Sequence, residues 1–364
     1  MTNSDASPAP QKHKGRGACS NPSNRFEQLS HIAIDDGWET ADNAPPPLTT
    51  TLSVDSSRTI INYNQSPDIP FDRSINPYRG CEHGCIYCYA RPSHAYLGYS
   101  PGLDFESQIT YKPNAAQLLR EEIGKRSYHC QPIALGVNTD AYQPVERQLK
   151  ITRQILEVLR DHQHPVTIVS KSSLIERDID LLSDMAHDGL VHVMISVTTL
   201  DNQLSRQLEP RAAAPQRRLQ TIATLKQAGI PVGALFAPVI PVLNDSEMES
   251  IVEACKNHGA TMMGYVTLRL PREVKVLFNE WLKQYHPLKL DHIFKRMRDL
   301  HNGTEYSADY GKRMTGSGVY ADMIAQRFRL IIKRFNLIDQ TEAKPLNCSR
   351  FKPDPQGGEQ LPLF

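Results

Sequence analysis

The sequence has neither a long apolar run nor an excess of charge of one sign. No stretch approaches the roughly 18 consecutive apolar residues of a membrane-spanning helix, and residues 1–17 lack the apolar core of a secretory signal. Lys and Arg number 41 against 40 Asp and Glu, so the formal net charge is +1. An overall basic field that would attract nucleic acid is therefore absent. We expect a cytoplasmic protein that does not bind membranes.

The chain also lacks the paired cysteines of a disulfide framework. Its seven cysteines are an odd number, and three of them fall within eight positions. In a reducing cytosol, clustered cysteines more often hold a metal or take part in redox chemistry. The other four cysteines stand alone, which argues against a second metal cluster. With 40% hydrophobic and 22% charged residues, the composition is that of an ordinary globular enzyme.

Both ends of the chain lack a sustained apolar period. Residues 1–50 are rich in Pro, Ser, Asn and Asp and include three consecutive prolines at 45–47. This composition predicts a disordered N-terminal arm. The last residues, 350–364, have the same character and predict a flexible tail.

Between the ends, short β-branched runs alternate with segments of helical period. The runs occupy residues 132–138, 165–170, 191–199, 231–240 and 261–270. A further short strand is expected at 73–76. In the helix that follows the first of these runs, Ile151, Ile155, Val158 and Leu159 form an apolar stripe at helical spacing.

Strand–helix alternation of this kind predicts an α/β fold with parallel strands and right-handed crossovers. Six units over residues 70–285 fit a partial (βα)6 barrel better than a closed eight-unit barrel. A doubly wound open sheet is the alternative, because strand order cannot be derived from one sequence. Residues 286–345 are expected to form a helical C-terminal extension.

The three clustered cysteines, Cys81, Cys85 and Cys88, are spaced C-x3-C-x2-C in a loop that contains two glycines. Soft thiolates on one tight loop suit an iron–sulfur cluster or zinc. A structural zinc site would need a fourth ligand such as His83 or His94, and zinc sites usually show a second cysteine or histidine pair. No second pair exists, so the spacing favours iron–sulfur and leaves zinc as the alternative.

The stretch NPYRGCEHGCIYCYAR, ahead of a βα repeat, resembles the signature of the radical S-adenosylmethionine (SAM) superfamily. It is similar to the branch that includes spore photoproduct lyase. Over residues 70–285, the segments LGVNTDAYQPVE, VTIVSKS, ISVTTLD and LEPRAAAPQRRL recur in that branch in this order.

The resemblance implies a partial (βα)6 barrel in which Cys81, Cys85 and Cys88 bind a [4Fe-4S] cluster. SAM would bind the fourth iron and be cleaved reductively to methionine and a 5′-deoxyadenosyl radical, which abstracts hydrogen from a substrate. An electron donor such as flavodoxin or ferredoxin would reduce the cluster. The protein's part in such chemistry is positioning, tuning and the exclusion of water.

The resemblance also implies a set of SAM contacts near the carboxyl ends of the strands. They comprise an aromatic residue near the adenine, two residues toward the amino group, a lysine for the carboxylate, a hydroxyl for the ribose and an arginine as a second carboxylate ligand. In that order they are Tyr87, Thr139 with Asp140, Lys171, Ser196 and Arg211. Three of these residues have an alternative explanation without a role in SAM binding: Asp140 could form an Asx turn, Lys171 could be a solvated loop lysine, and Arg211 could be a surface arginine.

One departure from the family pattern limits the functional inference. In spore photoproduct lyase a hydrogen-donor cysteine precedes the position of Thr139–Asp140, and here that place holds Val137. Valine cannot donate a hydrogen atom, so the repair activity is not expected. The substrate, the reaction product and the oligomeric state are not encoded in any motif.

Two further alternatives concern the whole protein. It could be a zinc-binding barrel without catalysis, or a radical enzyme that acts on nucleic acid without the lyase-type cysteine. The second would use local basic groups, although charge runs are usually solvated helix faces. These groups are Lys12, Lys14 and Arg16, then Arg217 and Arg218, and lastly Lys295, Arg296 and Arg298.

Overall fold

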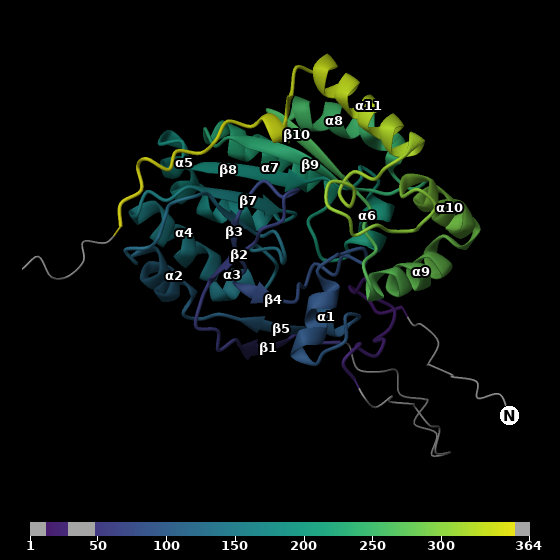
Figure 1. Ribbon diagram of the computed structural model, residues 1–364, viewed down its shortest axis with the longest axis horizontal. Helices are drawn as coiled ribbons and strands as arrows, with labels where there is room; N and C mark the ends of the chain where they lie inside the picture. The colour runs from purple at the N-terminus through teal and green to yellow at the C-terminus, as the bar shows by residue number, and fades with distance from the viewer. Residues whose placement is uncertain (1–11, 28–47, 354–364) are drawn as a thin grey trace, which may run out of the picture.

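The computed structural model describes residues 12–27 and 48–353. Its main sheet has eight strands in the order β11-β10-β9-β8-β7-β6-β3-β2, at the centre of Figure 1. The strands, in chain order, are β2 (Ile61–Tyr63), β3 (Arg73–Ile75), β6 (Ile133–Leu135), β7 (Val166–Ser170), β8 (Val191–Ser196), β9 (Val232–Val239), β10 (Met262–Thr267) and β11 (Ile338–Asp339).

The strand order identifies the fold as a partial barrel. The neighbours from β3 through β6, β7, β8 and β9 to β10 pair in parallel and in sequence order. A doubly wound sheet would reverse its order at a switch point, and none occurs here. The sheet ends with antiparallel β2 at one edge and β11 at the other. The six predicted units are therefore confirmed.

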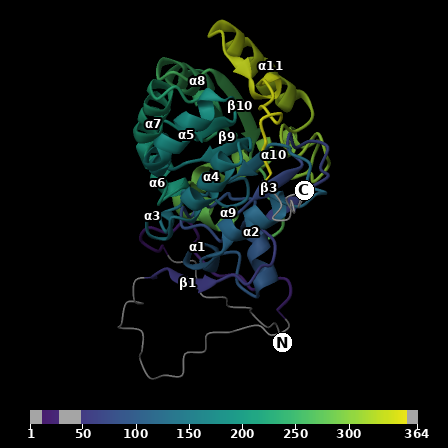
Figure 2. The same cartoon turned by 90° about the vertical axis from the view of Figure 1, so that its left-hand side faces the viewer.

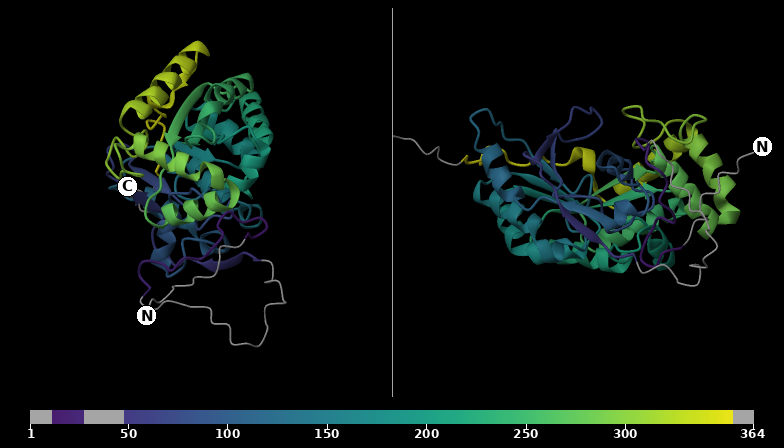
Figure 3. Two further views of the ribbon diagram at one scale, coloured as in Figure 1. Left: turned by 90° about the vertical axis from the view of Figure 1, so that its right-hand side faces the viewer. Right: turned by 90° about the horizontal axis from the view of Figure 1, so that it is seen from below.

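Helices cover the convex side of this curved sheet, as the right-hand view of Figure 3 shows. In α4 the predicted stripe is buried, with Ile155 and Leu159 inaccessible to solvent, so the apolar period drives the packing. The main helices are α2 (Ala115–Ile123), α4 (Ile151–Asp161), α5 (Ile179–His187), α7 (Pro215–Gln227), α8 (Met248–Asn257) and α9 (Glu273–Tyr285). Short helices are α1 (Asp104–Ser107), α3 (Glu146–Leu149) and α6 (Asn202–Leu208), with 3-10 turns at η2 (Arg91–Leu97), η3 (Ser173–Asp178), η4 (Asp245–Glu247), η5 (Pro287–Lys289) and η6 (Gln340–Glu342).

A second, three-stranded sheet lies below the barrel in Figure 1 and was not predicted. Its strands are β1 (Thr51–Val54), β5 (Gln108–Tyr111) and β4 (Tyr78–Arg79), with β5 in the middle. The strands are only two to four residues long, too short to show a period in sequence. Because β4 ends at Arg79, two residues before Cys81, this sheet supports the start of the cysteine loop.

The predicted C-terminal extension contains α10 (Leu290–Leu300) and α11 (Val319–Arg334). The two helices pack together at one end of the barrel (Figure 2). On α11, Arg327 forms an ion pair with Glu249 of α8 at 2.6 Å. The chain then adds β11 to the barrel sheet, so the extension is joined to the barrel. No helix among residues 12–27 and 48–353 is both long and apolar enough to cross a lipid bilayer.

The structure differs from the prediction of disorder for one part of the N-terminal arm. Residues 12–27 lie against the rest of the protein, and Arg16, Gly17, Ala18 and Cys19 are buried. Residues 1–11 and 28–47 of the predicted arm lie outside the described residues, as does 354–364 of the predicted tail. The described end of the tail also packs, because the Lys352 amide donates to the His162 carbonyl at 2.9 Å.

Candidate functional site

The loop that carries the clustered cysteines lies between β4 and η2 and is largely enclosed. Cys81 and Cys85 are buried, and Cys88 is partly buried. Two glycines permit the tight path, with φ of +79° at Gly80 and +66° at Gly84, where other residues are strained. A Cβ at Gly84 would stand 2.7 Å from a carboxylate oxygen of Glu106. The loop therefore needs glycine for both its backbone shape and its packing.

The backbone around Cys81 is held by a buried side chain from another part of the chain. Gln143 accepts a hydrogen bond from the Glu82 amide at 2.9 Å and donates to the Gly80 carbonyl at 3.2 Å. The Cys81 amide itself donates to the carbonyl of Phe105 at 2.8 Å. Gln143 has no solvent exposure. The position of Cys81 is thus determined from both sides.

The second part of the loop is held by a buried ion pair between Arg91 and Glu106. Arg91 donates to the carbonyl of Cys85 at 2.9 Å. Glu106 in turn accepts hydrogen bonds from the amides of Gly17 at 2.9 Å and Ala18 at 2.8 Å. Both charged side chains are fully buried. The N-terminal segment 12–27 consequently forms one wall of the cysteine loop.

His83 and Asp140 form a buried pair, with 3.4 Å between Nδ1 and the carboxylate. Burial, the largest single effect, lowers the pKa of His83, but the charges of Asp140 and Cys81 and the hydrogen bonds to them together raise that pKa to about 10. Burial raises the pKa of Asp140, but His83 and backbone hydrogen bonds leave it at about 2. Asp140 also accepts hydrogen bonds from the Tyr142 amide at 2.9 Å and from the Lys171 amide at 2.8 Å. The first of these is the Asx turn that was the alternative to a SAM contact.

Three of the predicted SAM contacts, Tyr87, Lys171 and Ser196, meet around a carboxylate that the sequence did not single out. The Tyr87 hydroxyl donates to Glu209. The Lys171 ammonium lies 2.7 Å from the Ser196 hydroxyl and 3.9 Å from Glu209. Arg218 forms a buried ion pair with the same carboxylate. Burial alone would raise the pKa of Glu209, but the Arg218 and Lys171 charges lower it to about 2.

The remaining predicted contacts lie on other sides of the loop. Thr139 is buried and donates to the carbonyl of Tyr78 at 2.9 Å. Arg211 forms an ion pair with Glu82 at 3.0 Å, while its backbone amide donates to the His83 carbonyl at 3.3 Å. All six predicted residues therefore contact the cysteine loop, its flanks or one another. Their roles toward SAM stay predictions.

Glu106, Gln143 and Glu209 were missed by the sequence analysis, although each is buried at this site. Gln143 and Glu209 lie inside the quoted segments LGVNTDAYQPVE and LEPRAAAPQRRL. A buried role for those two polar residues could have been suspected from their place inside these segments. Nothing near Glu106 in the sequence points to the loop.

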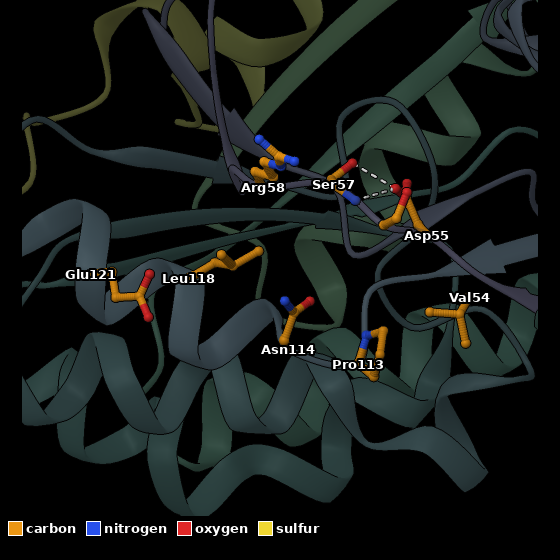
Figure 4. A pocket seen from close by; sticks show the side chains of 9 residues that line it. Val54, Asp55, Ser57, Arg58, Pro113, Asn114, Leu118 and Glu121 are labelled. Carbon is orange, nitrogen blue, oxygen red and sulfur yellow. Dashed lines mark hydrogen bonds between the residues drawn. The ribbon is translucent and has the colours of Figure 1, made fainter.

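Two open hollows flank the small sheet. One of about 540 Å³ lies beside Val54, Asp55, Pro113 and Leu118 (Figure 4), among residues that do not belong to the cysteine loop. The other, of about 420 Å³, is adjacent to the loop, since Glu82 lines it.

The donor set of the loop, three clustered thiols, is of the kind that iron–sulfur clusters use. No three His, Cys, Asp or Glu side chains in the described part of the chain gather closely enough to hold one metal ion. A cubane instead takes each thiolate on a different iron. Burial and then the Glu209 charge raise the pKa of Cys85, and Cys88 and Cys81 raise it further. The three thiols therefore lie within electrostatic reach of one another, and cluster binding would deprotonate them.

Comparisons with known proteins relate the chain to one protein family. A family model described as the radical SAM superfamily matches residues 75–255. An uncharacterized protein of Mycobacterium tuberculosis is 32% identical over 279 residues, which cover 76% of this chain and 78% of the relative. An uncharacterized protein of Methanocaldococcus jannaschii is 29% identical over 230 residues, covering 62% and 82% of the two chains.

Among solved structures, spore photoproduct lyase complexed with dinucleoside spore photoproduct is similar, with a TM-score of 0.51 and 16% sequence identity. The match covers 79% of this chain and 81% of the lyase. At this identity the likeness shows a shared fold.

Proposed function

The chain belongs to the radical SAM superfamily, and from this premise we propose that Cys81, Cys85 and Cys88 bind a [4Fe-4S] cluster at which SAM is cleaved. The observation that carries the proposal is the enclosed cysteine loop, braced at Cys81 by Gln143 and at Cys85 by Arg91. When bound, the cluster would pass one electron to the SAM sulfonium, which yields methionine and a 5′-deoxyadenosyl radical able to abstract hydrogen from a substrate.

The polar group around Glu209 supplies a binding site for SAM beside the loop. Lys171 brings a positive charge that Glu209 balances only in part, because Arg218 already pairs with that carboxylate. A SAM carboxylate near Lys171 would complete the neutralisation. Tyr87 belongs both to this group and to the cysteine motif, so it links the proposed SAM site to the proposed cluster site.

Burial gives this site the dry surroundings that radical chemistry requires. Tyr87 and Ser196 are buried, and Lys171 is only partly exposed. Excluding water strengthens charge interactions and prevents quenching of reactive species. The backbone of Val137 accepts a hydrogen bond from the Tyr89 hydroxyl, but its side chain has only strong C–H bonds and no thiol hydrogen to donate. The lyase-type repair reaction is therefore not part of the proposal.

Four of the basic residues on which the nucleic-acid alternative depended are paired with acidic side chains. Arg217 is paired with Glu176 at 2.7 Å, and Arg218 is buried against Glu209. Arg296 and Arg298 are paired with acidic neighbours. Charges that are already neutralised add little to phosphate binding. The substrate class thus stays open.

The test is anaerobic reconstitution with iron and sulfide, followed by reduction and EPR spectroscopy with and without SAM. A reduced [4Fe-4S] signal that changes on addition of SAM is expected. Cys85→Ala should lose the signal, whereas Cys255→Ala, a buried cysteine on α8, should retain it. Tightly bound zinc with no cluster would instead support the non-catalytic zinc-binding protein.

A further inference from the structure

Arg269 is a charged side chain at the edge of the barrel where the proposed SAM contacts lie, and the proposed function does not use it. It comes two residues after the end of β10 at Thr267. Lys171 follows β7 directly, and Ser196 is the last residue of β8. Because the barrel strands are parallel, their carboxyl ends meet at one edge, which is where active sites of such barrels form. Arg269 therefore belongs to the same edge as Lys171 and Ser196.

The guanidinium of Arg269 lies over the ring of Tyr89, with 4.7 Å between its central carbon and the ring centroid. Tyr89 follows Cys88 directly in the sequence. Tyr87, on the other side of that cysteine, instead donates to Glu209. Whereas Tyr87 is buried, Tyr89 is 43% exposed. Arg269 thus contacts a part of the cysteine loop that solvent reaches, apart from the polar group around Glu209.

Arg269 lacks a strong hydrogen-bond acceptor. One Nη donates to the thioether of Met314 at 3.5 Å, and sulfur is a weak acceptor. Its Nε is buried and has no hydrogen-bond partner in the part of the chain that the structure describes. Among residues 12–27 and 48–353, no acidic side chain forms an ion pair with this guanidinium. Leaving a buried donor unsatisfied is costly, so such groups usually serve a ligand or a function.

Arg313, in the segment between α10 and α11, shows the contrast with an arginine that has a partner. Its Nε and one Nη donate to the two carboxylate oxygens of Asp68 at 2.8 and 2.6 Å. That carboxylate comes from the connection between β2 and β3. The neighbouring Arg269 has no such counter-charge in the described chain, so its charge is available to a ligand.

The surroundings of Arg269 hold its side chain in place. Thr267 donates to the Met314 carbonyl through both its amide, at 2.8 Å, and its hydroxyl, at 3.0 Å. Met314 is thereby attached to the end of β10, and Arg269 contacts its thioether as well as the Tyr89 ring. Stacking uses the face of a guanidinium and leaves donors at its edge. Those donors form a planar fork that matches the oxygens of a carboxylate or a phosphate.

We propose that Arg269 binds an oxyanion group of the substrate, a phosphate or a carboxylate, and so selects a small anionic substrate. The inference rests on the proposed function, since it concerns the molecule on which the radical acts. A substrate anchored at Arg269 would lie beside Tyr89 and Cys88, next to the proposed cluster site. The whole chain is nearly neutral at +1, so one cation matched to one anionic group fits a small molecule better than a polyanion.

The experiment maps the reaction of phenylglyoxal, which modifies accessible guanidinium groups, on the reconstituted full chain by mass spectrometry. The rate of modification is followed in chloride, in inorganic phosphate and in acetate at equal ionic strength. A further series in chloride contains SAM. Arg272 is the control within the same chain, because it is an exposed arginine on the same connection between β10 and α9.

We expect phosphate, acetate or both to slow the modification of Arg269 about fivefold relative to chloride, while the rate at Arg272 stays the same. Protection by phosphate alone would support a phosphate ester as the substrate, and protection by acetate alone would support a carboxylic acid. An unreactive Arg269, equal rates in the three salts, or protection by SAM alone would overturn the substrate site.

The proposed function fails in a different way, namely if reconstitution yields no cluster. Phenylglyoxal mapping on the same chain would still show whether an oxyanion protects Arg269, because the measurement does not depend on SAM cleavage. The two failures are therefore distinguishable.

Discussion

The side-chain amide of Gln143 binds the backbone on both sides of Cys81, accepting from the Glu82 amide and donating to the Gly80 carbonyl. A glutamine placed in this way uses both its acceptor and a donor on one short stretch of loop. Because the stretch is buried, the two backbone groups have little access to water if the side chain is removed. Gln143 therefore acts as a positioning residue for a proposed cluster ligand.

Gln143→Leu should weaken cluster assembly while leaving the fold intact. It preserves approximate size but leaves two buried backbone groups unsatisfied, each at a cost of about 1–3 kcal/mol. Loss of a group that orients a metal ligand typically lowers metal affinity by about 10–100-fold. Iron bound per chain at limiting iron would measure the effect, with circular dichroism to check folding. Gln148→Leu, at an exposed position nearby, is the control, and equal iron in the two variants would contradict the prediction.

Glu106→Gln should loosen the N-terminal segment from the cysteine loop. The change removes the carboxylate charge that Arg91 pairs with and one acceptor for the Gly17 and Ala18 amides. Breaking one partner of a buried ion pair typically costs about 3–5 kcal/mol. Urea denaturation should show that loss, and limited proteolysis should cut within residues 12–27 sooner. Glu121→Gln, an exposed site on α2, should change neither; proteolysis unchanged in Glu106→Gln would refute the role.

His164 should make folding stability depend on pH in the weakly acidic range. Burial lowers its pKa from 6.5 to about 4, so the folded state keeps the ring neutral while the unfolded state takes up a proton below about pH 6.5. Its contribution is present in full above pH 6.5 and is lost as the pH falls toward 4. The pKa difference corresponds to about 3 kcal/mol.

The measurement is the free energy of unfolding in urea at pH 7.5, 6 and 4.5. His164→Gln should show a shallower decline than the unaltered protein, whereas substitution of the exposed His129 should not. Parallel curves for His164→Gln and the unaltered protein would show that the ring does not stay neutral in the fold.

Cys130 and Cys348 should form a disulfide when the protein is oxidised. The two thiols lie within electrostatic reach of each other, since burial followed by the Cys348 charge raises the pKa of Cys130 to about 12. Nearby, the Phe351 ring packs 5.6 Å from the ring of Tyr128, which keeps the tail against the barrel. Oxidised glutathione would remove two hydrogen atoms from the pair and leave as two reduced glutathione molecules.

Because the thiolate is the reactive form, the oxidation should be slow at pH 7 and faster at pH 9. Peptide mapping by mass spectrometry should find 130 linked to 348 in the unaltered protein, and a glutathione adduct on Cys130 in Cys348→Ser. Independent glutathione adducts on both cysteines of the unaltered protein would argue against the pairing.

Much of the fold and the proposed ligand set could be derived from local sequence. The stripe of Ile151, Ile155 and Leu159 determines one face of α4, and C-x3-C-x2-C places three thiols on one loop whatever the rest of the chain does. Such features depend on neighbours within a few residues, because helical and strand periods are short. The six βα units followed from the same periods and are confirmed by the strand pairing.

Only the tertiary structure decided which distant groups complete the site. Gln143 meets the Glu82 amide across 61 positions, Glu106 meets Gly17 across 89 and Tyr87 meets Glu209 across 122. A contact between residues so far apart produces no periodic pattern in the sequence, because any buried polar residue could supply the hydrogen-bond partner of another. The prediction of disorder for residues 12–27 differs from the structure for the same reason. Their composition is that of a disordered arm, yet the buried carboxylate of Glu106 accepts hydrogen bonds from the amides of Gly17 and Ala18. Burying these two amides without a partner would be costly, so the carboxylate allows this part of the segment to pack.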